Sequence, residues 1–223
     1  VMAERCVIIG AGDLTVSEIP LREGDYVIAA DGGFAYCRYL EIEPDLVLGD
    51  FDSLDENNME AIMEMRSREP EKVRVLPVKK DDTDMLAAIK EGLKLGYKEF
   101  VIYGGQGGRL AHTMANIQCL NYLKEKGARG YLMDGDGMIL VAKNETVSFK
   151  KNLEGLLSLF SLGDKAEGVT IRNMKYLLDN ATVTNDFPIG VSNEFIGKES
   201  SITVENGTLL IMICLLYTSP SPE

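Results

Sequence analysis

The sequence Leu46-Val47-Leu48-Gly49-Asp50-Phe51-Asp52-Ser53 places an apolar run, a glycine and two closely spaced aspartates in direct succession. Acids at positions i and i+2 just after a strand can project from its end toward one point. Magnesium takes one or two such carboxylates and completes its shell with substrate phosphates and water. The pattern therefore predicts a metal-nucleotide site and phosphoryl or pyrophosphoryl transfer.

Strand-like and helical segments alternate around this run, up to about residue 133. The expected strands cover residues 6–9, 26–30, 46–48, 73–78, 100–103 and 131–133. Helical patterns cover residues 84–95 and 110–126, each followed by a glycine. The alternation predicts an α/β N-terminal domain with a mostly parallel sheet and flanking helices, over residues 1–135.

Short strands with few helical patterns follow residues 134–137. They cover residues 138–142, 146–149, 156–162, 169–171, 181–183, 201–204 and 209–213. This texture predicts an all-β antiparallel sandwich domain over residues 138–214. We expect residues 215–223, which are rich in serine and proline, to form a disordered or non-native tail.

Composition excludes several classes of partner. A formal net charge of −12 over 223 residues would repel a phosphate backbone, so we expect no nucleic acid. The longest apolar run, residues 209–217, is too short to cross a bilayer, and no signal peptide is recognisable, so we expect no membrane partner. The four cysteines are scattered without C-x-x-C spacing, which favours a reducing, cytoplasmic location.

A second acidic cluster, Lys80-Asp81-Asp82-Thr83-Asp84, follows an apolar run and opens a helix. Helix N-termini favour anions such as phosphate, while like charges from two loops repel one another unless a cation offsets them. These observations favour a metal-nucleotide site. The structural alternative is helix capping, by Asp82 or Thr83 here and by a capping box of Ser53 with Glu56 in the earlier cluster.

The third cluster, Gly104-Gly105-Gln106-Gly107-Gly108-Arg109, runs from an expected strand into an expected helix. Its glycines let backbone amides approach a phosphate, and Arg109 is placed to neutralise charge on a leaving group. Arg109, His112 and Asn116 share one helix face. Alternatively, His112 only forms a hydrogen bond with a neighbouring loop and has no ligand.

Asp31-Gly32-Gly33 forms a further turn after a strand, at the carboxyl edge where open α/β sheets bind ligands. Taken alone, this segment could be a tight turn without a functional role. Several such turns on one edge of a sheet are harder to explain without a ligand.

In this order, the motifs resemble the thiamine pyrophosphokinases, which transfer pyrophosphate from ATP to thiamine and release AMP. The resemblance rests on Asp31-Gly32-Gly33, on residues 44–53 and 80–84, on Gly107-Gly108-Arg109 with His112 and Asn116, on Ser192-Asn193-Glu194-Phe195 and on residues 204–210. The family's fold, an α/β nucleotide domain followed by a β-sandwich, agrees with the two textures described above.

The resemblance implies Mg²⁺, ATP as co-substrate, and a homodimer that holds thiamine between its subunits. The implied catalytic residues are Asp50, Asp52, Asp84 and Arg109, of which the three aspartates are also the implied magnesium ligands. The implied nucleotide-binding residues are Asp31, Gly32, Gly33, Ser53, Lys80, Asp81, Thr83, Gly105, Gly107, Gly108, His112 and Asn116. The implied thiamine-binding residues are Ser192, Asn193 and Phe195.

One position departs from the family pattern G-G-R-x-D-H, because Ala111 stands where the carboxylate is usual. The missing carboxylate leaves open a catalytically impaired protein that binds thiamine or nucleotide. A nucleotide-sugar glycosyltransferase is another alternative, since such enzymes also use a D-x-D metal site.

Overall fold

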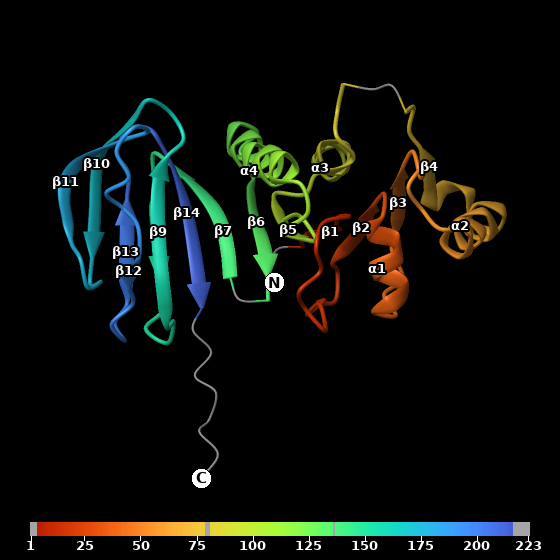
Figure 1. The fold of residues 1–223 in the computed structure, drawn as a ribbon, viewed down its shortest axis with the longest axis horizontal. Coiled ribbons are helices and arrows are strands. Elements are labelled where there is room, and N and C mark those ends of the chain that lie inside the picture. Colours follow the sequence, from red (N-terminus) through yellow and green to blue (C-terminus); the bar gives the residue numbers. More distant parts are fainter. Residues whose placement is uncertain (1–3, 79–80, 136, 216–223) are drawn as a thin grey trace, which may run out of the picture. The chain divides into compact units, whose positions relative to one another are not determined.

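The computed structural model describes residues 4–78, 81–135 and 137–215, and its elements are labelled in Figure 1. The chain divides into two compact units, Val1–Gly135 and Asp136–Glu223. Among the described residues, no helix has both the length and the apolar character needed to cross a bilayer.

The first unit is built on a parallel sheet. Its strands are β1 (Cys6–Ile9), β2 (Tyr26–Ala30), β3 (Leu46–Gly49), β4 (Val73–Val75), β5 (Glu99–Tyr103) and β6 (Arg129–Asp134). They lie in the order β6-β5-β1-β2-β3-β4, and each neighbouring pair is parallel. All residues of β1 and β3 are buried, as expected for strands covered on both faces. The predicted α/β unit with a parallel sheet is therefore present.

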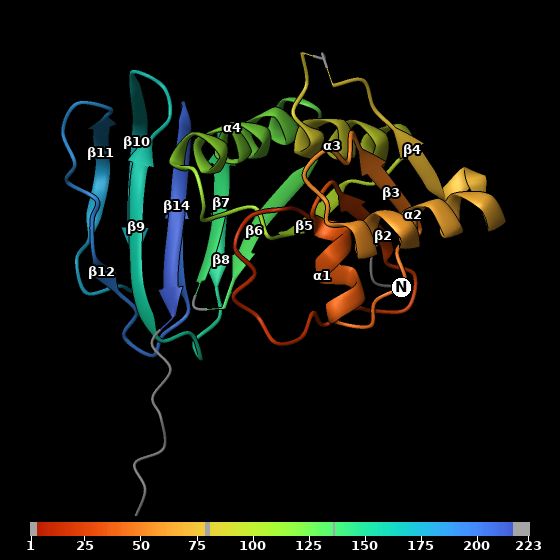
Figure 2. The same cartoon turned by 45° about the vertical axis from the view of Figure 1, so that its right-hand side comes forward.

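Helices cover both faces of this sheet. They are α1 (Gly33–Tyr39), α2 (Glu56–Arg68), α3 (Asp84–Lys94) and α4 (Leu110–Glu125), with a 3₁₀ turn over Pro70–Lys72. Figure 2 shows α3 and α4 on one side of the sheet and α1 on the other. Helix α3 buries Met85, Ala88, Ile89 and Gly92, the spacing of an amphipathic helix. A Cβ on Gly92 would lie 2.6 Å from the Phe100 ring, so glycine permits the close approach of α3 to β5.

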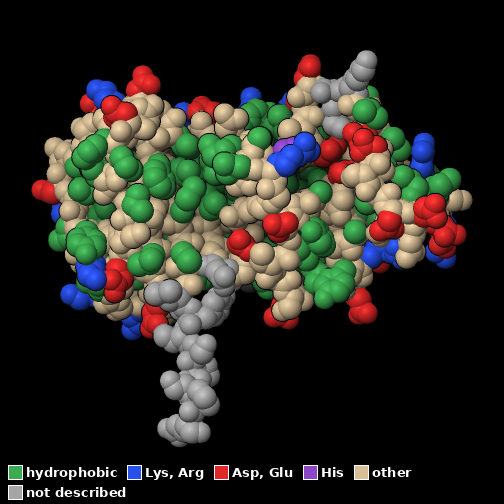
Figure 3. Space-filling model, viewed as in Figure 1, with side chains coloured by type: hydrophobic (Ala, Val, Ile, Leu, Met, Phe, Trp, Pro, Cys, Tyr) green, Lys and Arg blue, Asp and Glu red, His purple; other side chains and the backbone are tan. Residues whose placement is uncertain are grey.

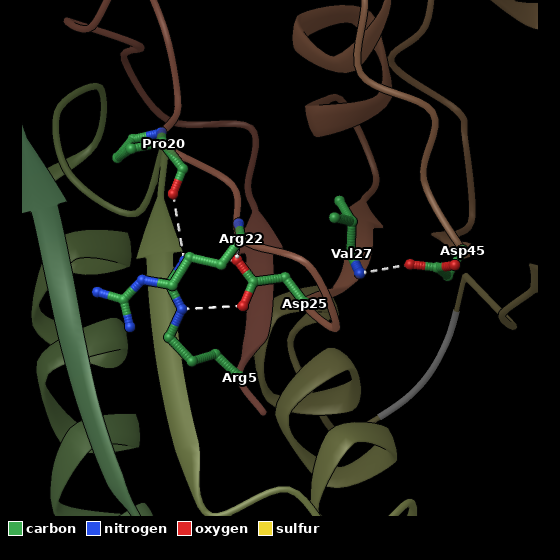
Figure 4. Close-up of polar contacts among 6 residues, drawn as sticks. All are labelled: Arg5, Pro20, Arg22, Asp25, Val27 and Asp45. Carbon is green, nitrogen blue, oxygen red and sulfur yellow. Dashed lines mark hydrogen bonds and ion pairs between the residues drawn. The ribbon is translucent and has the colours of Figure 1, made fainter. Parts of the chain in front are cut away.

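A buried ion pair closes the amino edge of the sheet (Figure 4). Arg5 Nε donates to Asp25 Oδ1 at 2.9 Å, Arg5 Nη2 contacts Asp25 Oδ2, and the side chains are 8% and 3% exposed. The Arg22 N–H donates to Asp25 Oδ2 at 2.8 Å. Burial by itself would raise the pKa of Asp25, but these hydrogen bonds and the Arg5 charge lower it below the ordinary value. Asp25 is thus a structural carboxylate with its charge satisfied.

The second unit is all-β. Its strands are β7 (Gly137–Lys143), β8 (Thr146–Phe149), β9 (Gly155–Ser161), β10 (Lys165–Arg172), β11 (Leu178–Thr184), β12 (Asn193–Glu194), β13 (Ser200–Thr203) and β14 (Thr208–Leu215). They form antiparallel sheets in the orders β12-β9-β14-β7 and β11-β10-β13-β8. Strands β10 and β14 contact each other across the two sheets, as do β9 and β11.

Three expectations about local structure need correction. Strand β4 ends at Val75 instead of residue 78, and Pro77 lacks the N–H that a longer ladder would need. The N-cap of α2 is Asp55, whose carboxylate accepts the Asn58 N–H at 2.8 Å, so Ser53 does not form the expected capping box. Strand β14 includes Leu215, which pairs with Gly155, so the expected tail cannot begin there. Residues 216–223 lie outside the described part of the chain.

Candidate active site

A cavity of about 570 Å³ opens at the carboxyl edge of the parallel sheet. It is formed by the segments that follow β1, β2, β3 and β5, together with the N-termini of α3 and α4. Of the residues expected from the sequence, it brings together Asp31, Ser53, Thr83, Asp84, Gly105, Gly107, Gly108, Arg109, His112 and Asn116. The lining does not include Gly32, Gly33, Asp50, Asp52 or Asp81, and Lys80 lies outside the described residues.

The acidic turn after β3 is held by Asp31. The Asp31 carboxylate accepts the Phe51 N–H at 3.3 Å and the Ser53 hydroxyl at 3.2 Å. A Cβ on Gly49 would lie 2.9 Å from the Asp31 Cα, which explains the glycine between the strand and the turn. Asp31 itself adopts a positive φ of 49°, a conformation that Asp tolerates better than most residues. The turns after β2 and β3 are therefore built as one piece.

The carboxylates of this turn repel one another. The charge of Asp50 is the main cause that raises the pKa of Asp52 above its ordinary value, with smaller contributions from burial, a hydrogen bond with Asp50, and the charges of Asp31 and Asp84. The charges that act on Asp52 thus come from acids of three separate segments, those after β2 and β3 and the start of α3. A bound cation would relieve this repulsion.

The acids do not form a closed metal cage. Within residues 4–78, 81–135 and 137–215, no group of three or more His, Cys, Asp or Glu side chains is arranged to hold a metal ion by itself. Magnesium differs from zinc in this respect, because it binds through one or two carboxylates and takes further oxygen ligands from phosphates and water. An open set of carboxylate oxygens beside a cavity fits that requirement.

The start of α3 shows which residues of the second acidic cluster serve the helix. Thr83 is the N-cap, and its hydroxyl accepts the Leu86 N–H at 3.1 Å, so the capping alternative is confirmed for this residue. Asp82 forms an ion pair with Lys90 at 2.7 Å. Asp82 therefore pairs with a cation of the helix that it precedes, whereas the charge of Asp84 contributes to the raised pKa of Asp52.

The glycine-rich loop packs closely on the segment after β1. Gly104 has a φ of +62°, its carbonyl accepts the Gly12 N–H at 2.7 Å, and a Cβ on Gly104 would lie 2.4 Å from the Gly10 carbonyl oxygen. Gly107 and Gly108 follow with φ of +78° and +60°. Only glycine adopts such a succession without strain. The conformation of the loop, which lines the cavity from Gly104 to Arg109, thus depends on its glycines.

Helix α4 supplies the polar side chains of this wall. Arg109 is its N-cap residue, is exposed, and lines the cavity. His112, the single histidine of the chain, is also exposed and is visible at the surface beside a basic side chain in Figure 3. Asn116 is buried, and its Nδ2 donates to the Gly105 carbonyl at 2.7 Å, so it braces the loop. Ala111 is exposed and does not belong to the cavity lining.

Sequence reasoning missed one wall of the cavity, Gly10-Ala11-Gly12 directly after β1. The sequence pattern that identifies this wall is the same as for residues 31–33 and 104–108, namely glycines directly after an apolar strand. Tyr36 supports this wall from outside the cavity lining, since its hydroxyl donates to the Gly12 carbonyl at 2.7 Å. Its contribution could not be read from the sequence.

The expected thiamine-binding residues lie in the second unit. Ser192 has a φ of +60°, and its N–H donates to Ser158 Oγ at 3.0 Å. Asn193 is buried and exchanges hydrogen bonds with the backbone of Tyr176, at 2.7 Å from its Nδ2 and 2.9 Å to its Oδ1. Phe195 is 7% exposed and packs edge to face on Phe149. Asn193 and Phe195 thus support the fold, and their contact with thiamine stays a prediction.

Comparisons with known proteins cover nearly the whole chain. Residues 20–132 match the family described as "Thiamin pyrophosphokinase, catalytic domain", and residues 144–209 match "Thiamin pyrophosphokinase, vitamin B1 binding domain". The chain is 27% identical over 187 residues to a thiamine pyrophosphokinase of Bacillus subtilis (strain 168), covering 83% of this chain and 85% of the relative.

Solved structures agree in fold. A thiamine pyrophosphokinase from Bacillus subtilis matches with a TM-score of 0.85 and 22% identity, over 95% of this chain and 99% of that one. A thiamin pyrophosphokinase family protein from Enterococcus faecalis matches with a TM-score of 0.79 and 25% identity, over 94% and 98% of the two chains. The resemblance seen in the motifs is confirmed: this chain belongs to the thiamin pyrophosphokinase family.

Proposed function

We propose that this chain transfers pyrophosphate from ATP to thiamine, giving thiamine diphosphate and AMP. Membership of the thiamin pyrophosphokinase family supports an ATP:thiamine diphosphotransferase. The structural observation that carries the proposal is the cavity of about 570 Å³, whose lining combines Asp31 and Asp84 with the glycine-rich loop and Arg109. The glycosyltransferase alternative is not favoured, because both halves of the chain match this family.

Magnesium is proposed at Asp50, Asp52 and Asp84. The raised pKa of Asp52 supports this assignment, since it reports several carboxylates whose mutual repulsion a divalent cation would offset. When bound, the ion would neutralise charge on the ATP phosphates. The protein's own contribution would be hard oxygen ligands from the turn after β3 and from the start of α3.

The nucleotide is proposed to lie along the glycine-rich loop. Gly105, Gly107 and Gly108 would offer backbone contacts, and Arg109 would neutralise charge on the leaving AMP. Ser53, Thr83, His112 and Asn116 line the same cavity, and Asp31 holds the acidic turn in place. Gly32, Gly33, Lys80 and Asp81 complete the proposed nucleotide set on the strength of the family pattern alone.

The reaction requires little covalent work from the protein. The hydroxyethyl oxygen of thiamine would attack the β-phosphorus of ATP and form a new O–P bond. The bond between that phosphorus and the α,β-bridging oxygen would break, and AMP would leave with the electron pair. A carboxylate of the acidic cluster would accept the hydroxyl proton. Catalysis is then mostly alignment and charge neutralisation.

A homodimer is proposed to complete the thiamine site at Ser192, Asn193 and Phe195. The second unit exposes large apolar side chains, between 43% and 65% exposed, at Tyr176, Leu177, Phe187, Ile189, Val191 and Ile196. Figure 3 also shows apolar side chains gathered over β9 and β14. Apolar surface of this kind is typical of protein–protein contacts, and a second copy of the chain is the proposed occupant.

A cytoplasmic location stays a prediction from the cysteine pattern.

Incubation with ATP, Mg²⁺ and thiamine tests the proposed function. AMP and thiamine diphosphate should appear together in equal amounts, and a nucleotide sugar should release no diphosphate. An inactive chain that gains activity on Ala111→Asp would instead identify an impaired protein. Light scattering should give a dimer for the wild type and a monomer for Phe187→Asp; a monomeric wild type would contradict the dimer.

A further inference from the structure

Asp13 has no role in the site as described so far, although it contacts the glycine-rich loop directly. It lies in the segment between β1 and β2, and its Oδ2 accepts the Gly108 N–H at 3.2 Å. The Asp13 N–H in turn donates to the Gln106 carbonyl at 2.8 Å. Asp13 therefore holds the loop by both backbone and side chain, although the two segments are 95 residues apart in the chain.

The shape of the loop matches this carboxylate. A Cβ on Gly107 would lie 2.2 Å from Asp13 Oδ2, so only a glycine lets the carboxylate pack on the backbone there. Gly107 and Gly108 both have positive φ, and the hydrogen bond from Gly108 to Asp13 closes this unusual turn. The two glycines and the aspartate thus form one structural arrangement.

The segment that carries Asp13 is anchored on its other side as well. Thr15 Oγ1 accepts the Gly135 N–H at 2.8 Å, just beyond the end of β6. The Gly12 carbonyl accepts the Tyr36 hydroxyl of α1. Asp13 is therefore held between fixed elements of the unit, which allows it to impose a position on the loop.

We propose that Asp13 is a positioning residue for nucleotide binding, which sets the conformation of the glycine-rich loop through Gly108. The proposal rests on the proposed function in taking ATP as the ligand of that loop. Its hydrogen bond and its charge have opposite effects. The hydrogen bond orders the loop for phosphate, while the negative charge beside the loop opposes an anionic ligand.

Two variants separate these effects. Asp13→Ala removes the acceptor, and KM for ATP should rise roughly tenfold or more while KM for thiamine is unchanged. Asp13→Asn keeps an acceptor oxygen and removes the charge, so KM for ATP should stay at or below the wild-type value. Asp45→Ala is the matched control, because Asp45 accepts the Val27 N–H at 2.8 Å at the opposite edge of the sheet (Figure 4) and should leave both KM values unchanged.

An NMR measurement without substrate tests the contact independently of the reaction. The Gly108 amide proton should resonate downfield in the wild type, move upfield in Asp13→Ala, and move less in Asp13→Asn. An unchanged KM for ATP in Asp13→Ala, or equal loss of all kinetic parameters without rescue by Asn, would overturn the proposal. A wild type that never releases AMP would refute the proposed function, and the Gly108 resonance would still decide whether Asp13 orders the loop.

Discussion

Aspartates at the two edges of the parallel sheet have pKa values shifted in opposite directions. At the amino edge, Asp25 is buried against Arg5 and its pKa is lowered. At the carboxyl edge, Asp52 stands exposed beside Asp50, and its pKa is raised. A satisfied carboxylate stabilises the fold, whereas like charges held together oppose it. The contrast supports the proposal that the carboxyl edge binds a cation, while the amino edge contributes to stability.

Removing a carboxylate at the carboxyl edge should have the largest effect. We expect Asp52→Asn to reduce kcat/KM by roughly 10³-fold, because the proposed metal loses a ligand and a charge. The melting temperature should stay the same or rise, since a repulsion is removed. Steady-state kinetics with thermal unfolding measures both, and Asp45→Asn serves as the control. An Asp52→Asn enzyme with most of its activity would contradict the metal assignment.

Removing the carboxylate at the amino edge should have the reverse pattern. Asp25→Ala leaves the Arg5 guanidinium buried without its partner and should cost about 3–5 kcal/mol of unfolding free energy. Activity at a temperature where the variant is folded should remain near the wild-type level. Denaturant unfolding measures the loss, and the double variant Arg5→Met with Asp25→Leu should recover much of it. A kinetic defect in folded Asp25→Ala would contradict a purely structural role for this carboxylate.

Acid should act on the two edges with opposite signs. The lowered pKa of Asp25 means that its stabilisation is complete above the unfolded-state pKa and is lost as the pH falls toward the folded-state value. The raised pKa of Asp52 means that its repulsion is present at neutral pH and is relieved as the pH falls through the folded-state value.

Melting temperatures followed from neutral pH to about pH 3 measure this difference. The gap between wild type and Asp25→Asn should narrow on acidification. Any extra stability of Asp52→Asn should be greatest at neutral pH and vanish in acid. Parallel curves for all three proteins would show that neither aspartate has a perturbed pKa.

The smallest effect is expected at Ala111. Its side chain is exposed and lies outside the cavity lining, so Ala111→Asp should change kcat/KM by less than about threefold. The same kinetic assay measures it, with Leu110→Asp on the neighbouring exposed position as the control. A gain of tenfold or more would show that the carboxyl edge lacks a charge that Asp50, Asp52 and Asp84 do not supply.

Much of the fold could be predicted because it depends on local patterns. Buried apolar runs located β1, β2, β3 and β5 to within a residue or so, and the glycines after α3 and α4 marked their ends. The alternative that Ser53 caps α2 was wrong, because Ser53 and Asp55 are both good capping residues and only the backbone path distinguishes them.

The sequence by itself determined the candidate residues for the chemistry, since aspartates, glycines and an arginine at strand ends can be read without knowing which strands are neighbours. Only the tertiary structure decided which of them meet. Strand β1 lies beside β5, which brings Asp13 to Gly108, and β2 lies beside β3, which brings the Asp31 carboxylate to the Phe51 N–H. The reason is physical: strand order is set by packing and hydrogen bonding between distant segments, and no local pattern contains that information.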